Sequence, residues 1–226
     1  MLTTMKPVHI LLVLSLFGLA SIVRANATPE EFEAWPEFRD TPTREINEGE
    51  LTFLTSPPDR RILQTRNWLT IDADSLESGW VNLHQCQGNL DPVPDVEIVY
   101  RFDSIRNLQV LSAEGMTSAV VKNGSVQMKN VQRDAEVCIK AEVQVLKMTG
   151  AGRYQLTSGP FHRRFLDGYY PIQLDYWLHY PVELLELESV KPVAEPGLAI
   201  NRQPGELRID ALFEGNLTIE LRFSSR

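Results

Sequence analysis

Residues 207–223 read LRIDALFEGNLTIELRF, two alternating runs on either side of a turn at 214–216. Apolar side chains occupy every second position of each run, which places them on one face of an extended strand. Charged residues such as Arg208 and Glu220 occupy the opposite face. The pattern predicts two half-buried strands that are joined as a β-hairpin.

The same period of two recurs upstream from about Arg61. The clearest case is 117–131, where Asn123-Gly124 provides the strongest short hairpin signal. Turn signals between the runs predict an all-β fold of antiparallel β-sandwich architecture, either as two small sandwich-like domains or as one extended one. Two glycines within 149–152 suggest a boundary between a first β domain, 61–150, and a second, 151–226. Further strands are expected at 66–72, 80–87, 96–102, 107–112, 136–146, 153–158, 171–180 and 184–190.

The first 27 residues resemble a cleavable export signal. Lys6 precedes an apolar run over 10–23, and Ala25-Asn26-Ala27 fits the small-residue pattern of a cleavage site. We therefore expect cleavage after Ala27, the alternative being an uncleaved membrane anchor. Residues 28–60 are acidic and interrupted by prolines, and they predict an extended leader with a short helix starting at Thr28.

Net charge narrows the classes of partner. Lys6 and Arg24 leave with the signal, so the formal net charge of −8 becomes −10. An acidic chain repels phosphate backbones and anionic lipid, so we expect no nucleic-acid partner. No later segment has 18 consecutive apolar residues, so no membrane span is expected after signal removal. The expected location is the periplasm of a Gram-negative bacterium or the secreted fraction, and the expected partner is an unidentified envelope protein or glycan.

The two cysteines, Cys86 and Cys138, each lie in a predicted strand of an exported chain, which predicts a disulfide. In the chain-entropy model, a disulfide that closes a loop of about 50 residues lowers the entropy of the unfolded chain and so stabilises the fold by about 4 kcal/mol. A metal site is the alternative, because His84 shares a strand face with Cys86. Such a site needs three or four converging ligands. We therefore expect no metal and no cofactor.

An aromatic-rich segment, PFHRRFLDGYYP at 160–171, is the main candidate for an interaction surface. Five of the six tyrosines of the chain lie between Tyr154 and Tyr180. Tyrosine offers rigid amphipathic area and arginine a planar hydrogen-bonding fork, which suits recognition. The structural alternative is an aromatic corner whose Asp167 pairs with one of the two arginines. The candidate residues are Phe161, His162, Arg163, Arg164, Phe165, Asp167, Tyr169 and Tyr170.

Part of this segment carries a resemblance. The run RRFLDGYYP at 163–171, with Gly79-Trp80-Val81 and the Asp91-Pro92-Val93-Pro94 turn, is similar to a group of exported proteobacterial proteins that have no known activity. The similarity extends from about residue 66 to the end of the chain. It implies a periplasmic or envelope setting and transfers no functional residue.

Catalytic motifs are missing from the sequence. It contains no nucleophile elbow, zinc-protease helix motif, phosphate-binding loop or dinucleotide fingerprint. No catalytic residue is therefore predicted. The favoured function is a non-catalytic periplasmic or envelope binding or interaction protein. The alternatives are a hydrolase of envelope polymers and a periplasmic assembly chaperone.

Overall fold

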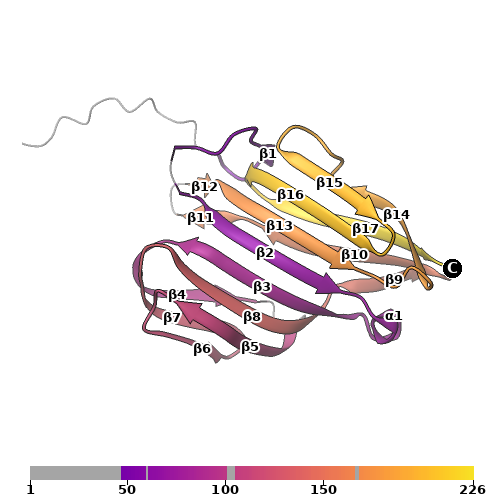
Figure 1. The fold of residues 1–226 in the computed structure, drawn as a ribbon, viewed down its shortest axis with the longest axis horizontal. Helices are drawn as coiled ribbons and strands as arrows, with labels where there is room; N and C mark the ends of the chain where they lie inside the picture. Colours follow the sequence, from indigo (N-terminus) through magenta and orange to yellow (C-terminus); the bar gives the residue numbers. More distant parts are fainter. Residues whose placement is uncertain (1–46, 60, 101–104, 166–167) are drawn as a thin grey trace, which may run out of the picture. The chain divides into compact units, whose positions relative to one another are not determined.

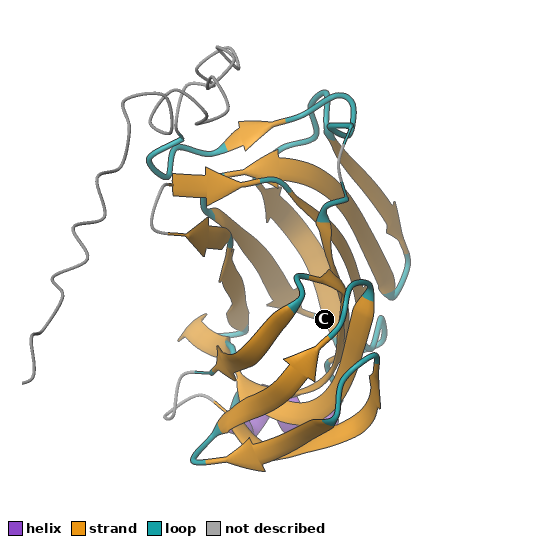
Figure 2. Ribbon diagram, turned by 90° about the vertical axis from the view of Figure 1, so that its left-hand side faces the viewer, coloured by secondary structure: helices purple, strands orange, loops and turns teal. Residues whose placement is uncertain are grey.

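The computed structural model describes residues 47–59, 61–100, 105–165 and 168–226. Residues 45–226 form one unit of the chain. The predicted signal peptide, its cleavage site, the helix at Thr28 and the part of the leader before residue 47 lie outside the described residues. Asp167 also lies outside them. Figure 2 shows that the described chain is almost entirely strand, with one short helix.

Eight of the described strands form the largest sheet. They are β1 (Thr52–Phe53), β2 (Leu63–Thr70), β3 (Trp80–Leu90), β5 (Ile105–Glu114), β8 (Ala135–Gln144), β13 (Ile172–His179), β15 (Leu198–Gln203) and β16 (Glu206–Glu214). The order β16-β13-β2-β3-β8-β5 is visible in Figure 1, and β1 and β15 both pair with β16. Within this sheet β13 and β2 are parallel, and the other pairs are antiparallel.

Three smaller sheets complete the described fold. A four-stranded sheet has the order β14 (Leu185–Lys191), β17 (Leu217–Ser225), β10 (Arg153–Phe161) and β9 (Leu146–Gly150). A three-stranded sheet has the order β4 (Val93–Val99), β7 (Ser125–Val131) and β6 (Ser118–Lys122). The pair β11 (Arg163–Phe165) and β12 (Gly168–Tyr170) forms a small hairpin. The predicted hairpin around Asn123-Gly124 is confirmed by the register of β6 and β7.

The two C-terminal strands form an arch and not the expected hairpin. β16 pairs with β13 in the eight-stranded sheet, whereas β17 pairs with β10 and β14 in the four-stranded sheet. The turn at 214–216 therefore carries the chain from one sheet to the other. Both strands keep the predicted alternation, and their apolar faces are buried in the core. The hairpin prediction was wrong because an arch and a hairpin have the same local apolar pattern.

The apolar faces of these two sheets share one core. Ring contacts join them directly: Tyr180, which follows β13, lies 5.3 Å from Phe223 of β17. Phe161 of β10 lies 6.4 Å from Tyr176 of β13, again in an edge-on arrangement. The core between them is made of alternate residues from each strand, as a sandwich requires. The predicted all-β, mostly antiparallel fold class is therefore confirmed.

Several elements were not predicted. Strands β9, β11, β12 and β15 are short, and the helix α1 (Ala73–Ser78) has only six residues. Asp72 caps α1 by accepting from the Ser75 amide at 2.9 Å, and Gly79 ends it with φ of 75°. The expected boundary at 149–152 is the turn between β9 and β10 of one sheet. Strands from both sides of that boundary share the eight-stranded sheet.

The end of the expected leader belongs to the sheet. Thr52 and Phe53 pair with the last residues of β16, and the amide of Leu54 donates to the Leu212 carbonyl at 2.8 Å. Phe53 packs edge-on against Phe213, with 6.4 Å between ring centroids. The segment expected to be an extended leader up to residue 60 therefore contains sheet residues, which pair with the end of β16 beside the arch.

Substituting Gly215 by Ala should destabilise the fold by about 1–3 kcal/mol, because this turn residue has φ of +86° and its new methyl group would meet the Glu50 backbone. Gly150→Ala is the matched control, since nothing lies within 4 Å of an added Cβ there. Urea unfolding of both variants measures the difference. If Gly215→Ala and Gly150→Ala were equally stable, close packing of the turn at Gly215 against the 47–54 segment would not contribute to stability.

Candidate functional site

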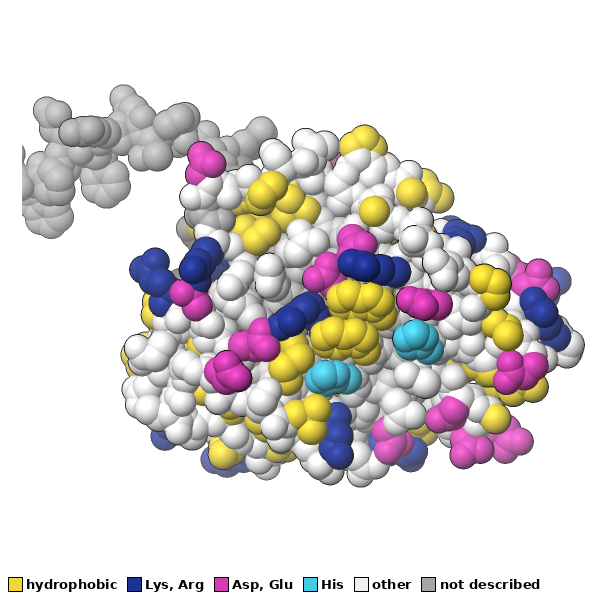
Figure 3. Space-filling view, viewed as in Figure 1, with side chains coloured by type: hydrophobic (Ala, Val, Ile, Leu, Met, Phe, Trp, Pro, Cys, Tyr) yellow, Lys and Arg dark blue, Asp and Glu magenta, His cyan; other side chains and the backbone are white. Residues whose placement is uncertain are grey.

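One row of side chains crosses the solvent-facing side of the eight-stranded sheet, which we call the outer face. The register places Arg208 of β16 beside Trp177 of β13, Trp177 beside Trp68 of β2, and Trp68 beside His84 of β3. Figure 3 shows hydrophobic side chains near the centre of this face, with basic and histidine side chains around them. We call these four residues the ladder.

The rings of the ladder stack on one another. Trp68 and Trp177 are 4.9 Å apart with an interplanar angle of 4°, and His84 stacks on Trp68 at 4.8 Å. The Arg208 guanidinium lies 5.2 Å from the Trp177 ring centroid. Because neighbours cover the ring faces, no flat aromatic platform is left for a sugar ring. The ladder is therefore best explained as cross-strand packing that stabilises the sheet.

Two carboxylates face each other in the next row of the outer face. Asp175 of β13 lies opposite Asp210 of β16 on one side and Arg66 of β2 on the other. Burial, followed by the interaction with Asp210, raises the pKa of Asp175, while Arg208 opposes this shift. Since the pKa is higher in the folded state, the proton on Asp175 stabilises the fold. That contribution is present at acidic pH and is lost as the pH rises through the raised pKa.

Asp175→Asn should therefore raise the melting temperature at pH 7, because the amide removes a half-buried charge that faces Asp210. The gain should shrink as the pH falls below about 4, where the wild-type carboxyl is protonated in the unfolded chain as well. Thermal unfolding from pH 3 to pH 8 measures this. Asp95→Asn, at an exposed position of β4, should change little; the prediction fails if the two variants have the same pH profile.

The aromatic segment forms the β11–β12 hairpin and its approach. Phe165 packs edge-on against Tyr170 at 5.2 Å, and His162 packs against Tyr169 at 5.9 Å. The Arg164 guanidinium lies 5.5 Å from the Tyr169 ring centroid. The structure thus brings together His162, Arg164, Phe165, Tyr169 and Tyr170 of the predicted surface, whereas Phe161 packs toward the core against Tyr176. The expected pairing to Asp167 lies outside the described residues.

Arg163 has a partner that the sequence analysis did not name. Its guanidinium pairs with Asp91, and only 13% of the Arg163 side chain is exposed. Asp91 belongs to the turn between β3 and β4, so two motifs that carry the sequence resemblance meet in this ion pair. Arg163 therefore joins its hairpin to a distant turn. Among the described residues, Arg164 instead contacts Tyr169 of the same hairpin.

Arg163→Ala should lower the melting temperature more than Arg164→Ala, because only Arg163 joins its hairpin to a distant turn. A double-mutant cycle of Arg163→Ala and Asp91→Ala should show a coupling of about 1 kcal/mol, limited by the exposure of Asp91. Chemical unfolding of the four proteins gives this value. Additive effects in the cycle would mean that the pair contributes nothing to stability.

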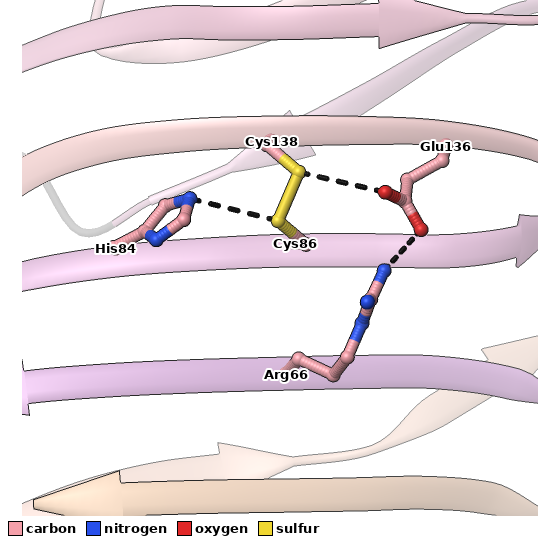
Figure 4. Close-up of a disulfide and its surroundings, with 5 residues drawn as sticks. All are labelled: Arg66, His84, Cys86, Glu136 and Cys138. Carbon is pink, nitrogen blue, oxygen red and sulfur yellow. Dashed lines mark hydrogen bonds and ion pairs between the residues drawn. A yellow bond between two sulfur atoms is a disulfide. The ribbon is translucent and has the colours of Figure 1, made fainter.

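The predicted disulfide between Cys86 and Cys138 is present. The two residues are directly opposite on β3 and β8. His84 Nε2 lies 3.6 Å from Cys86 Sγ, and Glu136 Oε1 lies 3.7 Å from Cys138 Sγ, while Arg66 pairs with the other carboxylate oxygen (Figure 4). A disulfide is consistent with an oxidising compartment outside the cytoplasm.

A cavity of about 530 Å³ lies between the sheets. Two residues of the predicted interaction surface, Phe161 and His162, line it. Most of the lining is apolar and comes from the inner sides of several strands, including Leu63, Leu69, Ile98, Val143, Val145 and Ile172. Its volume lies within the range of about 300–1,000 Å³ that is typical of small-molecule sites.

A chain of polar side chains also lines this cavity. The Tyr100 hydroxyl donates to Gln85 Oε1 at 2.8 Å, and Gln85 Nε2 donates to Asn67 Oδ1 at 2.7 Å. Burial raises the pKa of Tyr100 well above its usual range, so this hydroxyl stays protonated as a donor. Asn67 is 1% exposed, and its Nδ2 has no partner among the described residues. Buried donors are nearly always paired, so this group requires an explanation.

The cavity was not found from the sequence. Asn67 and Gln85 lie at inward positions of predicted strands, where a polar residue is unusual, and this was the available signal. The cavity itself depends on how far apart two sheets lie, which no local pattern specifies.

No protein-family model matches the chain, and no curated protein matches its sequence. Solved structures give distant matches to an M1 zinc metallopeptidase from Deinococcus radiodurans. A mutant bound to a Tyr-Ser-Ala substrate matches with 13% identity and a TM-score of 0.40, over 73% of this chain and 43% of that chain. The enzyme without that mutation matches with 11% identity and a TM-score of 0.38, over 79% and 43%. The chain therefore spans less than half of these relatives.

The described part of the chain holds no helix with the length and apolar character that a bilayer crossing requires.

Proposed function

We propose that this chain is a non-catalytic binding protein of the periplasm or cell envelope, and that it holds a small ligand in the cavity between its sheets. The cavity carries this proposal, because its volume of about 530 Å³ is typical of small-molecule sites and the side chains of Asn67 and Gln85 are part of its lining. Asn67 Nδ2 lacks an acceptor among the described residues, and an unpaired buried donor costs about 1–3 kcal/mol. A ligand oxygen that reached this amide through a small rotation of the Asn67 side chain would remove that cost.

The lining also limits the charge of the ligand. Among the described lining residues there is no Lys, Arg, Asp or Glu, so a charged group would lose its hydration without a counter-ion. The preferred ligand is therefore uncharged, with an apolar body and at least one carbonyl or ether oxygen.

The site can be tested with the fluorescent apolar probe N-phenyl-1-naphthylamine. The wild type should bind the probe, and Ile98→Trp should weaken binding by at least about tenfold by filling the cavity, if it removes about 1.4 kcal/mol of contact. Val120→Trp is the matched control, since this residue lies in the same three-stranded sheet and is 52% exposed. Circular dichroism confirms that both variants are folded.

Displacement of the probe tests the ligand chemistry. A medium-chain methyl ester should displace it better than the matching free fatty acid at pH 7, because the described lining residues offer hydrogen-bond donors but include no Lys or Arg. Asn67→Leu should weaken the ester by about fivefold, the value of one hydrogen bond of about 1 kcal/mol. The proposal would be overturned if Ile98→Trp and Val120→Trp bound the probe equally, or if the free acid bound better than the ester.

A further inference from the structure

Three side chains at the disulfide have the composition of a metal site. Cys86 and Cys138 offer two sulfur atoms and His84 one ring nitrogen, and these three atoms all lie within 4.8 Å of one another. Glu136 has a carboxylate oxygen 3.7 Å from Cys138 Sγ but does not belong to this group. Two thiolates and an imidazole are ligands that Zn²⁺ takes in proteins, and a water can fill its fourth position. We propose that Cys86, Cys138 and His84 bind Zn²⁺ when the disulfide is reduced.

The spacing between His84 and Cys86 is that of neighbouring ligands on a tetrahedral zinc ion. With Zn–S of about 2.3 Å and Zn–N of about 2.0 Å, neighbouring ligand atoms lie roughly 3.5–3.8 Å apart. His84 Nε2 to Cys86 Sγ is 3.6 Å. The backbone also keeps both sulfurs near each other after reduction, because β3 and β8 pair along their length and hold the two Cα atoms 4.1 Å apart.

Neighbouring residues orient the ligands, as second-layer contacts do in metal sites. Trp68 stacks on the His84 ring at 4.8 Å, and in Figure 4 the imidazole points toward Cys86. Arg66 holds one oxygen of Glu136 and leaves the other beside Cys138. The ladder thus supplies part of the support for the site.

Reduction and zinc binding are linked through the sulfur atoms. A dithiol reductant gives two electrons and two protons to the disulfide, and it is itself oxidised to a disulfide. The two new thiols then lose their protons to solvent as their sulfurs bond to zinc. In the oxidised chain the sulfurs are bonded to each other and no thiolate is available. Zinc and disulfide formation therefore compete for the same two atoms.

Spectroscopic titration of the full chain tests this site. The protein is reduced with a phosphine under nitrogen and titrated with Co²⁺, whose bonds to thiolate absorb strongly in the near ultraviolet. The reduced wild type should show this absorption, saturate at one ion per chain and lose the band when Zn²⁺ is added. The oxidised protein should show no such band.

Two histidine variants distinguish zinc binding at the proposed cluster from non-specific metal binding. His84→Ala should weaken zinc binding by at least about tenfold, the effect expected of a lost metal-site contact. His179→Ala is the matched control, since it lies on the outer face at an exposed position of β13 and is absent from the cluster. Equal affinities in these two variants would overturn the proposal, as would a reduced wild type without the thiolate band.

Zinc binding can also be tested if the chain unfolds when its disulfide is reduced. In that case Zn²⁺ should restore the β-sheet circular dichroism of the reduced wild type, because metal affinity then contributes to folding. It should fail to do so for Cys86→Ser. If zinc does not restore the fold of the reduced wild type, the proposal is wrong. The probe-binding experiment on the oxidised protein is independent of this outcome.

Discussion

Packing between the apolar faces of the eight-stranded and four-stranded sheets, which β16 and β17 connect, is the contact on which the other layers of the structure depend. The two strands are consecutive, yet each pairs only within its own sheet, so the turn at 214–216 sets how the sheets face each other. Alternate side chains of both strands are fully buried. Once these faces are in contact, β13 and β10 are brought together as neighbours of β16 and β17. The cavity lies beside this core, and strands of both large sheets and of the three-stranded sheet contribute to its lining.

The strands could be predicted from the sequence because a period of two is a local property. Asn123-Gly124 could also be assigned to a hairpin, since both residues have positive φ, as the tight turn requires. The arch could not be distinguished from a hairpin, because partner choice depends on residues far away in the chain. Helix α1 was not predicted although its capping residues Asp72, Ser75 and Gly79 can be recognised in the sequence. Its six residues are too few to show a helical period in their apolar positions.

The candidate sites also differ in how much of each could be predicted from the sequence. The disulfide followed from a count of two cysteines in predicted strands, and the cluster of ligands around it needed the register of β3 against β8. The stacking of Trp68 on Trp177 depends on a parallel pair that no local signal indicates. Arg163 pairs with a residue 72 positions away, so its partner could not be chosen from the aromatic segment alone. Composition thus indicated which residues are unusual, while register determined which of them meet.

The parallel pairing of β2 with β13 affects how this chain must fold. Leu63 lies opposite Ile172, so the centre of the largest sheet joins segments that are about a hundred residues apart. If the chain folds from its N-terminal end, β2 can pair with β3, β3 with β8 and β8 with β5, but the other edge of β2 stays open until β13 is available. Non-local pairing of this kind slows folding, and an open edge strand invites association with other chains. Protection of the open edge of β2 until β13 pairs with it would therefore matter more for this protein than for one built only from consecutive hairpins.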